Sequence, residues 1–115
     1  GTGIGSAIIV NGTLLTNTEL GHLEIDGTDA EKNASSGQKT LQGLDWEQWA
    51  QRLQRYYGHV EFLLNPDLFV VGGGVSENHE KFMPLLNLKT PMIPAKLLNT
   101  AGIVGAAYYA AKQNA

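Results

Sequence analysis

The sequence contains no cysteine. A disulfide framework and any thiolate metal site are therefore excluded, and zinc binding is not expected. Positive charge is also scarce: Lys and Arg total 8 residues against 11 Asp and Glu, which gives a net charge of −3. This balance argues against non-specific binding to nucleic acid or to membranes. The longest apolar-rich stretch, residues 101–111, is interrupted by glycine and tyrosine and is too short to span a bilayer.

The 115 residues are enough for one domain with a buried core. Hydrophobic residues make up 43% of the chain and occur throughout it, which argues against disorder. We therefore treat residues 1–115 as one folded unit.

Hydrophobic patterns predict three elements clearly. Two β-prone runs, residues 8–10 and 13–15, flank Asn11-Gly12, which is typical of a tight hairpin turn. Apolar residues three or four apart predict a helix over residues 45–64, with Asp45 as its N-cap and Gln48 completing a capping box. A short apolar run at 68–71 indicates a strand covered on both faces.

The remaining segments give weaker signals. We expect a short helix at residues 30–36, a connector at 38–43, a helix from 76 to about 83, a strand at 92–93 and a final helix at about 100–112. This order predicts an α/β domain in which helices cover one mixed sheet.

Two glycine-rich segments are candidate anion sites. The first glycine loop, residues 1–5, contains Gly1, Thr2, Gly3 and Gly5, and its backbone N–H groups can approach a phosphate closely. The second glycine turn, Gly72, Gly73 and Gly74, lies between a predicted strand and a helix that Ser76 is expected to cap. Either segment could instead be a purely structural turn.

A third candidate is the acidic loop, residues 19–31, which carries Glu19, His22 and Glu31. Carboxylates and an imidazole can hydrogen-bond vicinal hydroxyl groups, so this loop could bind a sugar. The alternative is a solvated acidic loop. In the isolated chain we expect the loop to be poorly ordered or displaced, because its polar side chains have few local partners.

Taken together, these motifs resemble the polyphosphate glucokinases, which belong to the ROK group of the actin-like and hexokinase-like superfamily. The resemblance covers nearly the whole chain and keeps the order of the motifs. The matching segments are Gly-Thr-Gly-Ile-Gly-Ser-Ala at 1–7, Asn-Thr-Glu-Leu-Gly-His-Leu-Glu at 17–24, Ala-Glu-Lys-Asn-Ala-Ser at 30–35, Trp-Glu-Gln-Trp at 46–49, Pro-Asp-Leu-Phe-Val-Val-Gly-Gly-Gly-Val-Ser at 66–76 and Asn-Thr-Ala-Gly-Ile-Val-Gly-Ala-Ala at 99–107.

The resemblance implies the C-terminal domain of an actin-like ATPase (ribonuclease H-like) fold. It implies that Glu19, His22 and Glu31 contact glucose, while both glycine segments hold the phosphoryl donor, polyphosphate or ATP. Mg²⁺ would accompany the donor, and an Asp would act as catalytic base. The parent protein would be a cytoplasmic homodimer.

Two departures from the pattern matter. The His/Cys zinc cluster of many ROK proteins is missing between His22 and Glu31, so no metal site is expected here. The N-terminal domain with the catalytic Asp is also absent from these residues, so we expect no catalytic residue in residues 1–115 and no activity from the isolated chain. The alternatives are an ATP-dependent ROK hexokinase and a non-catalytic ROK sugar-sensing repressor. The final helix is expected to pack against the missing domain.

Overall fold

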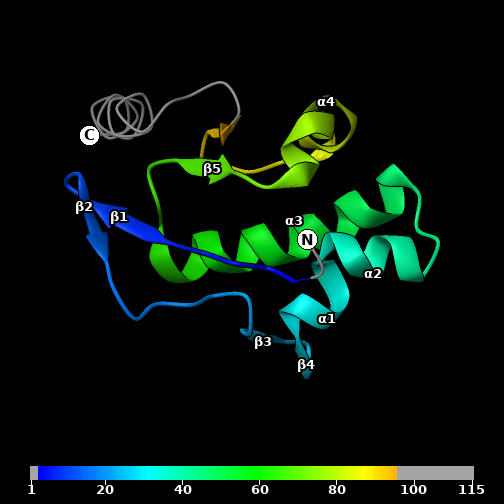
Figure 1. Cartoon of the computed structure of the whole chain (residues 1–115), viewed down its shortest axis with the longest axis horizontal. Coiled ribbons are helices and arrows are strands. Elements are labelled where there is room, and N and C mark those ends of the chain that lie inside the picture. The colour runs from blue at the N-terminus through cyan, green and yellow to red at the C-terminus, as the bar shows by residue number, and fades with distance from the viewer. Residues whose placement is uncertain (1–2, 96–115) are drawn as a thin grey trace.

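The computed structural model describes residues 3–95. Its central element is the long helix α3 (Trp46–Leu64), against which α1 and α4 pack (Figure 1). The predicted caps of α3 are confirmed. The Asp45 carboxylate accepts a hydrogen bond from Gln48 N, and the Gln48 side chain accepts one from Asp45 N. Asn65, in the left-handed region with φ of 49°, ends the helix before Pro66.

Two hairpins precede the helices. Strands β1 (Ile8–Val10) and β2 (Thr13–Leu15) pair antiparallel around Asn11 and Gly12. These two turn residues have φ of 52° and 77°, as the Asn-Gly pattern predicts. A second hairpin joins β3 (Glu24–Ile25) and β4 (Thr28–Asp29).

The segment after β4 is more helical than predicted. Helix α1 (Ala30–Ala34) is followed directly by α2 (Ser36–Leu41), and Ser35 both ends α1 and caps α2 through a hydrogen bond from Gln38 N. The expected connector at 38–43 is therefore wrong for residues 38–41. A serine that can serve two helices allows the chain to bend sharply and stay helical.

The last described elements are short. Strand β5 (Phe69–Val71) pairs in parallel with β6 (Met92–Pro94). Both strands lie where the sequence predicts them, within one residue at each end. Between them lie two 3-10 helices, η1 (Gly74–Asn78) and η2 (Met83–Leu85), on either side of α4 (His79–Phe82). The predicted final helix at about 100–112 lies outside the described residues.

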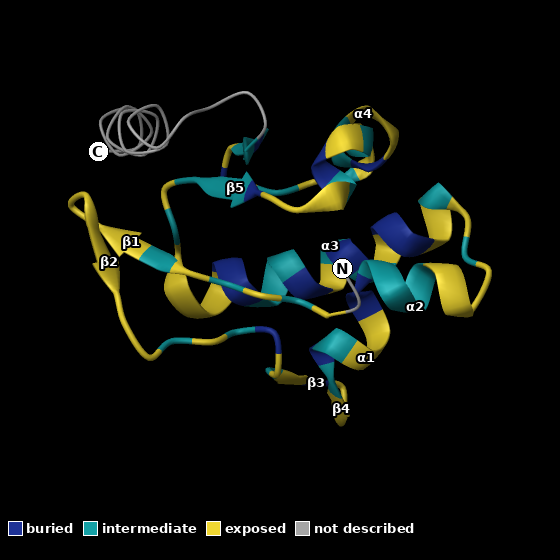
Figure 2. Cartoon of the chain, in the orientation of Figure 1, coloured by how far each residue is buried: buried dark blue, intermediate teal, exposed yellow. Residues whose placement is uncertain are grey.

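The sheet differs from the prediction. The described residues form three separate two-stranded pairs, so no single mixed sheet is present among them. Each strand has only two or three residues and pairs with one neighbour. Strands β1 and β2 are mostly exposed (Figure 2). In β5, which was expected to be covered on both faces, only Val71 is buried among residues 3–95, so the covering is incomplete there.

The core lies along one face of α3. Trp49 and Phe82 meet edge to face with ring centroids 5.1 Å apart, and Trp46 stacks on Phe82. The buried hydrophobic residues are Ile25, Ala30, Ala34, Trp49, Ala50, Leu53, Tyr56, Val60, Val71 and Phe82. The spacing of apolar residues in 45–64 also predicts Leu63 on this face, yet its side chain is about half exposed. Within residues 3–95, no helix combines the length and apolarity needed to cross a membrane.

Candidate functional site

The backbone of the acidic loop is fixed at several points. Ala30 N donates to Leu23 O at 2.8 Å, and Glu31 N donates to Gly21 O at 2.9 Å. From α3, the Tyr56 hydroxyl donates to Leu20 O at 3.1 Å. Burial raises the pKa of Tyr56 to about 12, so this hydroxyl remains a donor at neutral pH. The loop is thus attached both to α1 and to the central helix.

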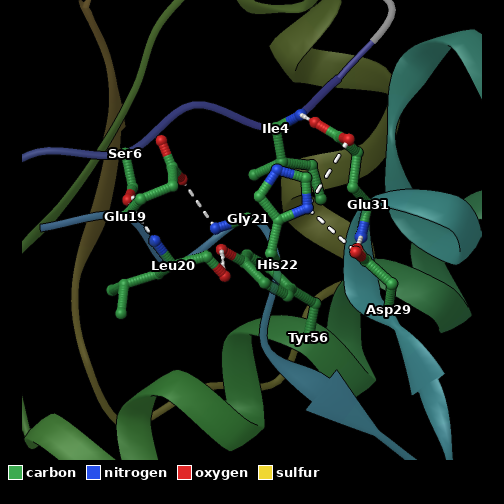
Figure 3. A network of polar contacts seen from close by, with 9 residues as sticks. All are labelled: Ile4, Ser6, Glu19, Leu20, Gly21, His22, Asp29, Glu31 and Tyr56. Atoms are coloured by element: carbon green, nitrogen blue, oxygen red, sulfur yellow. Dashed lines mark hydrogen bonds and ion pairs between the residues drawn. The ribbon is translucent and has the colours of Figure 1, made fainter.

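Glu19 folds back onto its own loop. Its Oε1 atom accepts a hydrogen bond from Gly21 N at 2.7 Å and one from the Ser6 hydroxyl at 3.2 Å (Figure 3). The bond from Gly21 is the main cause of a lowered pKa at Glu19. The carboxylate therefore stays ionised, and its second oxygen can accept a hydrogen bond from a ligand.

His22 lies beside two carboxylates. Its Nδ1 atom is 2.9 Å from Asp29 Oδ2 and 3.8 Å from Glu31 Oε2 (Figure 3). The hydrogen bond with Asp29 raises the pKa of His22 and lowers that of Asp29. The predicted residues Glu19, His22 and Glu31 are therefore brought into one network.

The first glycine loop joins the same network. Ile4 N donates to Glu31 Oε1 at 2.8 Å, and the Ser6 hydroxyl accepts from Leu20 N at 2.7 Å. Two segments that the sequence analysis treated as separate candidates are thus in direct contact. Gly1 and Thr2 lie outside the described residues.

Two glycines allow this contact. A Cβ atom on Gly21 would lie 2.1 Å from Ile4 O, and one on Gly3 would lie 2.1 Å from Glu31 Oε1. Both separations are far below van der Waals contact. At Gly21 the obstacle is backbone, so a side chain there would push the two segments apart, whereas at Gly3 the carboxylate of Glu31 would have to move away. Gly5, in contrast, has no atom within 4 Å of such a Cβ.

One expectation about this loop is wrong. Its polar side chains were expected to have few local partners, yet Glu19, His22 and Glu31 each have a hydrogen-bonding or charged partner within the described residues. The partners come from the first glycine loop and from the start of α1, which sequence spacing alone does not bring together.

The second glycine turn lies elsewhere, between β5 and η1. In the view of Figure 1, α3 runs between β5 and α1. Gly73 has φ of 79°, and a Cβ on Gly73 or Gly74 would meet open space. The turn is therefore open to a ligand, but none of the hydrogen bonds described above connects it to the acidic loop.

The expected role of Ser76 is wrong. Ser76 does not cap a helix; it lies inside η1, and its hydroxyl donates to Gly73 O at 2.8 Å. The helical stretch from Gly74 is made of short 3-10 and α segments. A strong helix dipole aimed at the turn is therefore not part of this site.

Three supporting residues were not singled out from the sequence: Ser6, Asp29 and Tyr56. Asp29 carried a usable signal, because aspartate just before a helix is a common N-cap, and here its Oδ1 accepts from Glu31 N at 2.9 Å. Ser6 and Tyr56 act over 14 and 36 residues of sequence separation, so local patterns could not identify them.

The candidate residues form an open surface. The side chain of His22 is 61% exposed. The described residues have two hollows of about 440 and 200 Å³ on other parts of their surface. Neither is lined by Glu19, His22 or Glu31. Among residues 3–95, no group of three or more His, Asp or Glu side chains is arranged to hold a metal ion.

Known proteins provide independent comparisons. The polyphosphate glucokinase of Mycobacterium tuberculosis (strain ATCC 25618 / H37Rv) is 51% identical over 107 residues, covering 93% of this chain and 40% of that protein. The polyphosphate glucokinase of Mycobacterium leprae (strain TN) is 50% identical over 107 residues, which is 33% of its length. No protein-family model matches the chain.

A solved structure extends the match to the fold. The crystal structure of inorganic polyphosphate/ATP-glucomannokinase from Arthrobacter sp. strain KM superposes with a TM-score of 0.82 and 56% identity, covering 98% of this chain and 45% of that one. The chain thus spans less than half the length of each of these three relatives. This chain is therefore a homologue, over nearly its whole length, of one segment of the polyphosphate glucokinases.

Proposed function

We propose that the full-length protein containing this chain is a glucokinase that transfers a phosphoryl group from polyphosphate or ATP to the 6-hydroxyl of glucose. The chain would form its C-terminal domain, in an actin-like ATPase fold. The observation that carries the proposal is the direct contact between the first glycine loop and the acidic loop, in a chain about half identical to polyphosphate glucokinases.

Glu19, His22 and Glu31 are proposed to bind the hydroxyl groups of glucose. Each has at least one atom held by a protein partner, so the side chains are positioned before a ligand arrives. Fixed acceptors of this kind suit a sugar, whose hydroxyl groups need hydrogen bonds when they leave water.

The first glycine loop, with Gly1, Thr2, Gly3 and Gly5, and the second glycine turn at 72–74 are proposed to bind the donor. Backbone N–H groups free of side chains can approach phosphate oxygens and stabilise their negative charge. Contact of the first loop with Glu31 would hold donor and sugar in a fixed relation.

The reaction breaks the bond between the terminal phosphorus and its bridging oxygen and forms a bond to the glucose 6-hydroxyl oxygen. The hydroxyl proton passes to an aspartate base, which we place outside residues 1–115. Magnesium would neutralise charge on the donor phosphates. Residues 3–95 contain no cluster of side chains suited to hold this ion by themselves.

A second domain would complete the site. The exposed position of His22 fits a half-site that another domain covers, and excluding water would strengthen each hydrogen bond. We further propose that the parent protein is a cytoplasmic homodimer.

The proposal is tested by assaying the purified full-length protein for glucose 6-phosphate, with polyphosphate and ATP as separate donors. We expect product with polyphosphate. Product with ATP but none with polyphosphate would instead indicate an ATP-dependent hexokinase. Glucose binding without product from either donor would indicate a sugar-sensing repressor and would contradict the proposal.

A further inference from the structure

We propose that Asp29 is a positioning residue that fixes the tautomer of His22, so that His22 Nε2 accepts a hydrogen bond from a hydroxyl group of the sugar. This inference rests on the proposed function, because it concerns how the same site recognises its substrate. It assigns a role to a residue outside the predicted sugar-binding set.

The carboxylate of Asp29 is held on both sides. Its Oδ1 accepts from Glu31 N at 2.9 Å as the N-cap of α1, while its Oδ2 lies 2.9 Å from His22 Nδ1 (Figure 3). An ionised carboxylate can only accept hydrogen bonds. The proton between the two groups must therefore belong to His22 Nδ1.

A neutral imidazole carries a single ring proton. With that proton on Nδ1, the Nε2 atom has a free lone pair and acts as an acceptor. The side chain of His22 is 61% exposed and that of Asp29 is 29% exposed, so the aspartate is the more enclosed partner. His22 is thus anchored through Nδ1 while much of its ring remains accessible to a ligand.

Within residues 3–95, the charged groups that shift the pKa of His22 are all acidic. Glu31 Oε2 is 3.8 Å from the same Nδ1 atom, and the charge of Glu19 also acts on the ring. Together with the hydrogen bond that His22 Nδ1 donates to Asp29, which contributes most, these charges raise the pKa of His22 above its ordinary value. Protonation makes Nε2 a donor, so the acceptor is lost as pH falls through this raised pKa.

The consequence for recognition is specific. The hydroxyl group that binds His22 must donate its proton, while its oxygen remains free to accept from another group. A substrate analogue in which fluorine replaces that hydroxyl can accept but cannot donate, so it should bind poorly.

Asp29→Asn separates the effect of Asp29 on the tautomer of His22 from its effect on helix capping, because asparagine is also a good N-cap. Its Oδ1 can keep the bond to Glu31 N, whereas its amide nitrogen would donate to His22 Nδ1 and move the ring proton to Nε2. Asp29→Ser retains a capping oxygen and removes the partner of His22 altogether. Asp26→Asn is the matched control, since it removes one negative charge from the same hairpin at a carboxylate that pairs with Arg55.

The experiment combines ¹⁵N NMR of histidine-labelled full-length protein with steady-state kinetics using glucose and polyphosphate. At a pH above the raised pKa of His22, where the ring is neutral, we expect its proton on Nδ1 in the wild type and on Nε2 in Asp29→Asn. The KM for glucose should rise about five- to tenfold in both Asp29 variants. The KM for polyphosphate should stay within about twofold, and Asp26→Asn should match the wild type in both constants.

Two results would overturn the inference: a wild-type His22 that carries its proton on Nε2, or an Asp29→Asn protein that switches tautomer with an unchanged KM for glucose. A folded variant is verified by its amide spectrum, and Asp29→Ser provides the kinetic test if Asp29→Asn does not fold. The wild-type tautomer is measured without turnover. A protein that shows the Nδ1–H form but phosphorylates no glucose would contradict the proposed function and not the positioning of His22.

Discussion

At the scale of single residues, the candidate site depends on side chains that have two partners. Glu19 contacts both its own loop and Ser6, and Glu31 contacts both His22 and Ile4. Such residues hold the loop in shape and also face the proposed sugar. Their substitution should therefore alter binding more than folding, because all of them remain at least partly accessible to solvent.

Replacing Glu19 or His22 by alanine in the full-length protein should lower kcat/KM for glucose. Each variant loses a hydrogen bond to a hydroxyl group, which costs about 1–3 kcal/mol, or roughly 5- to 150-fold. Unfolding by urea should show a much smaller change. Glu47→Ala, an exposed acidic change at the start of α3, is the control. Unchanged glucose kinetics in both variants would refute their assignment.

Gly21→Ala should separate the first glycine loop from the acidic loop, because the new Cβ would lie 2.1 Å from Ile4 O. We expect a loss of about 1–3 kcal/mol in the free energy of unfolding, as in other overpacked sites. The matched control is Gly5→Ala, where a Cβ meets no atom within 4 Å. Equal stability of the two variants in urea titrations would show that the close contact is not essential.

At the scale of elements, sequence patterns predict the parts of the fold that depend on residues close together in the chain. The Asn11-Gly12 hairpin and the capping box of α3 are encoded within a few residues, and both are confirmed. The break at Ser35 and the contact of the two loops could not be predicted in this way. They depend on partners such as Tyr56, which reaches Leu20 from a distant part of the chain.

The end of α3 provides a test of stability. Glu61 is buried, and its Oε2 accepts from Thr90 N at 2.8 Å, just before β6. Glu61→Ala would leave this buried N–H without a partner, so we expect a loss of about 1–3 kcal/mol in the free energy of unfolding. Glu61→Gln keeps an acceptor oxygen and should lose less.

The same residue should make stability depend on pH. Hydrogen bonds from Thr90 lower the pKa of Glu61 in the folded chain. A lowered pKa stabilises the fold above the unfolded-state pKa, and this contribution is lost as pH falls through the folded-state pKa. The stability difference between wild type and Glu61→Gln should therefore shrink on acidification in urea titrations. A difference that is constant with pH would contradict this role.

The second glycine turn yields a prediction about the donor. Gly73 has a positive φ of 79°, which alanine adopts only with strain, whereas Gly74 has no such constraint and faces open space. In the full-length protein, Gly73→Ala should raise the KM for the phosphoryl donor while the KM for glucose changes little. Gly43→Ala, at a glycine with φ of 64° and open space outside the proposed donor site, controls for backbone strain. If Gly73→Ala leaves the donor constant at the wild-type value, the turn is only structural.

At the scale of the whole molecule, the described residues leave the candidate site open to solvent. The three strand pairs stay separate, the β1–β2 hairpin exposes Ile9, Val10, Leu14 and Leu15, and the candidate residues lie on an open surface. Sequence motifs were enough to propose the candidate residues of this surface. The absence of one continuous sheet among residues 3–95 could not be predicted in this way, since it depends on contacts between distant strands.

We propose that this chain supplies the glucose- and donor-binding loops of a polyphosphate glucokinase, while the catalytic base lies outside it. The most direct test is a coupled assay of glucose 6-phosphate formation from polyphosphate, with the purified chain and the full-length protein measured in parallel. We predict turnover by the full-length protein and none by residues 1–115. Turnover that follows the purified chain, or its absence from a folded full-length protein with either donor, would contradict the account.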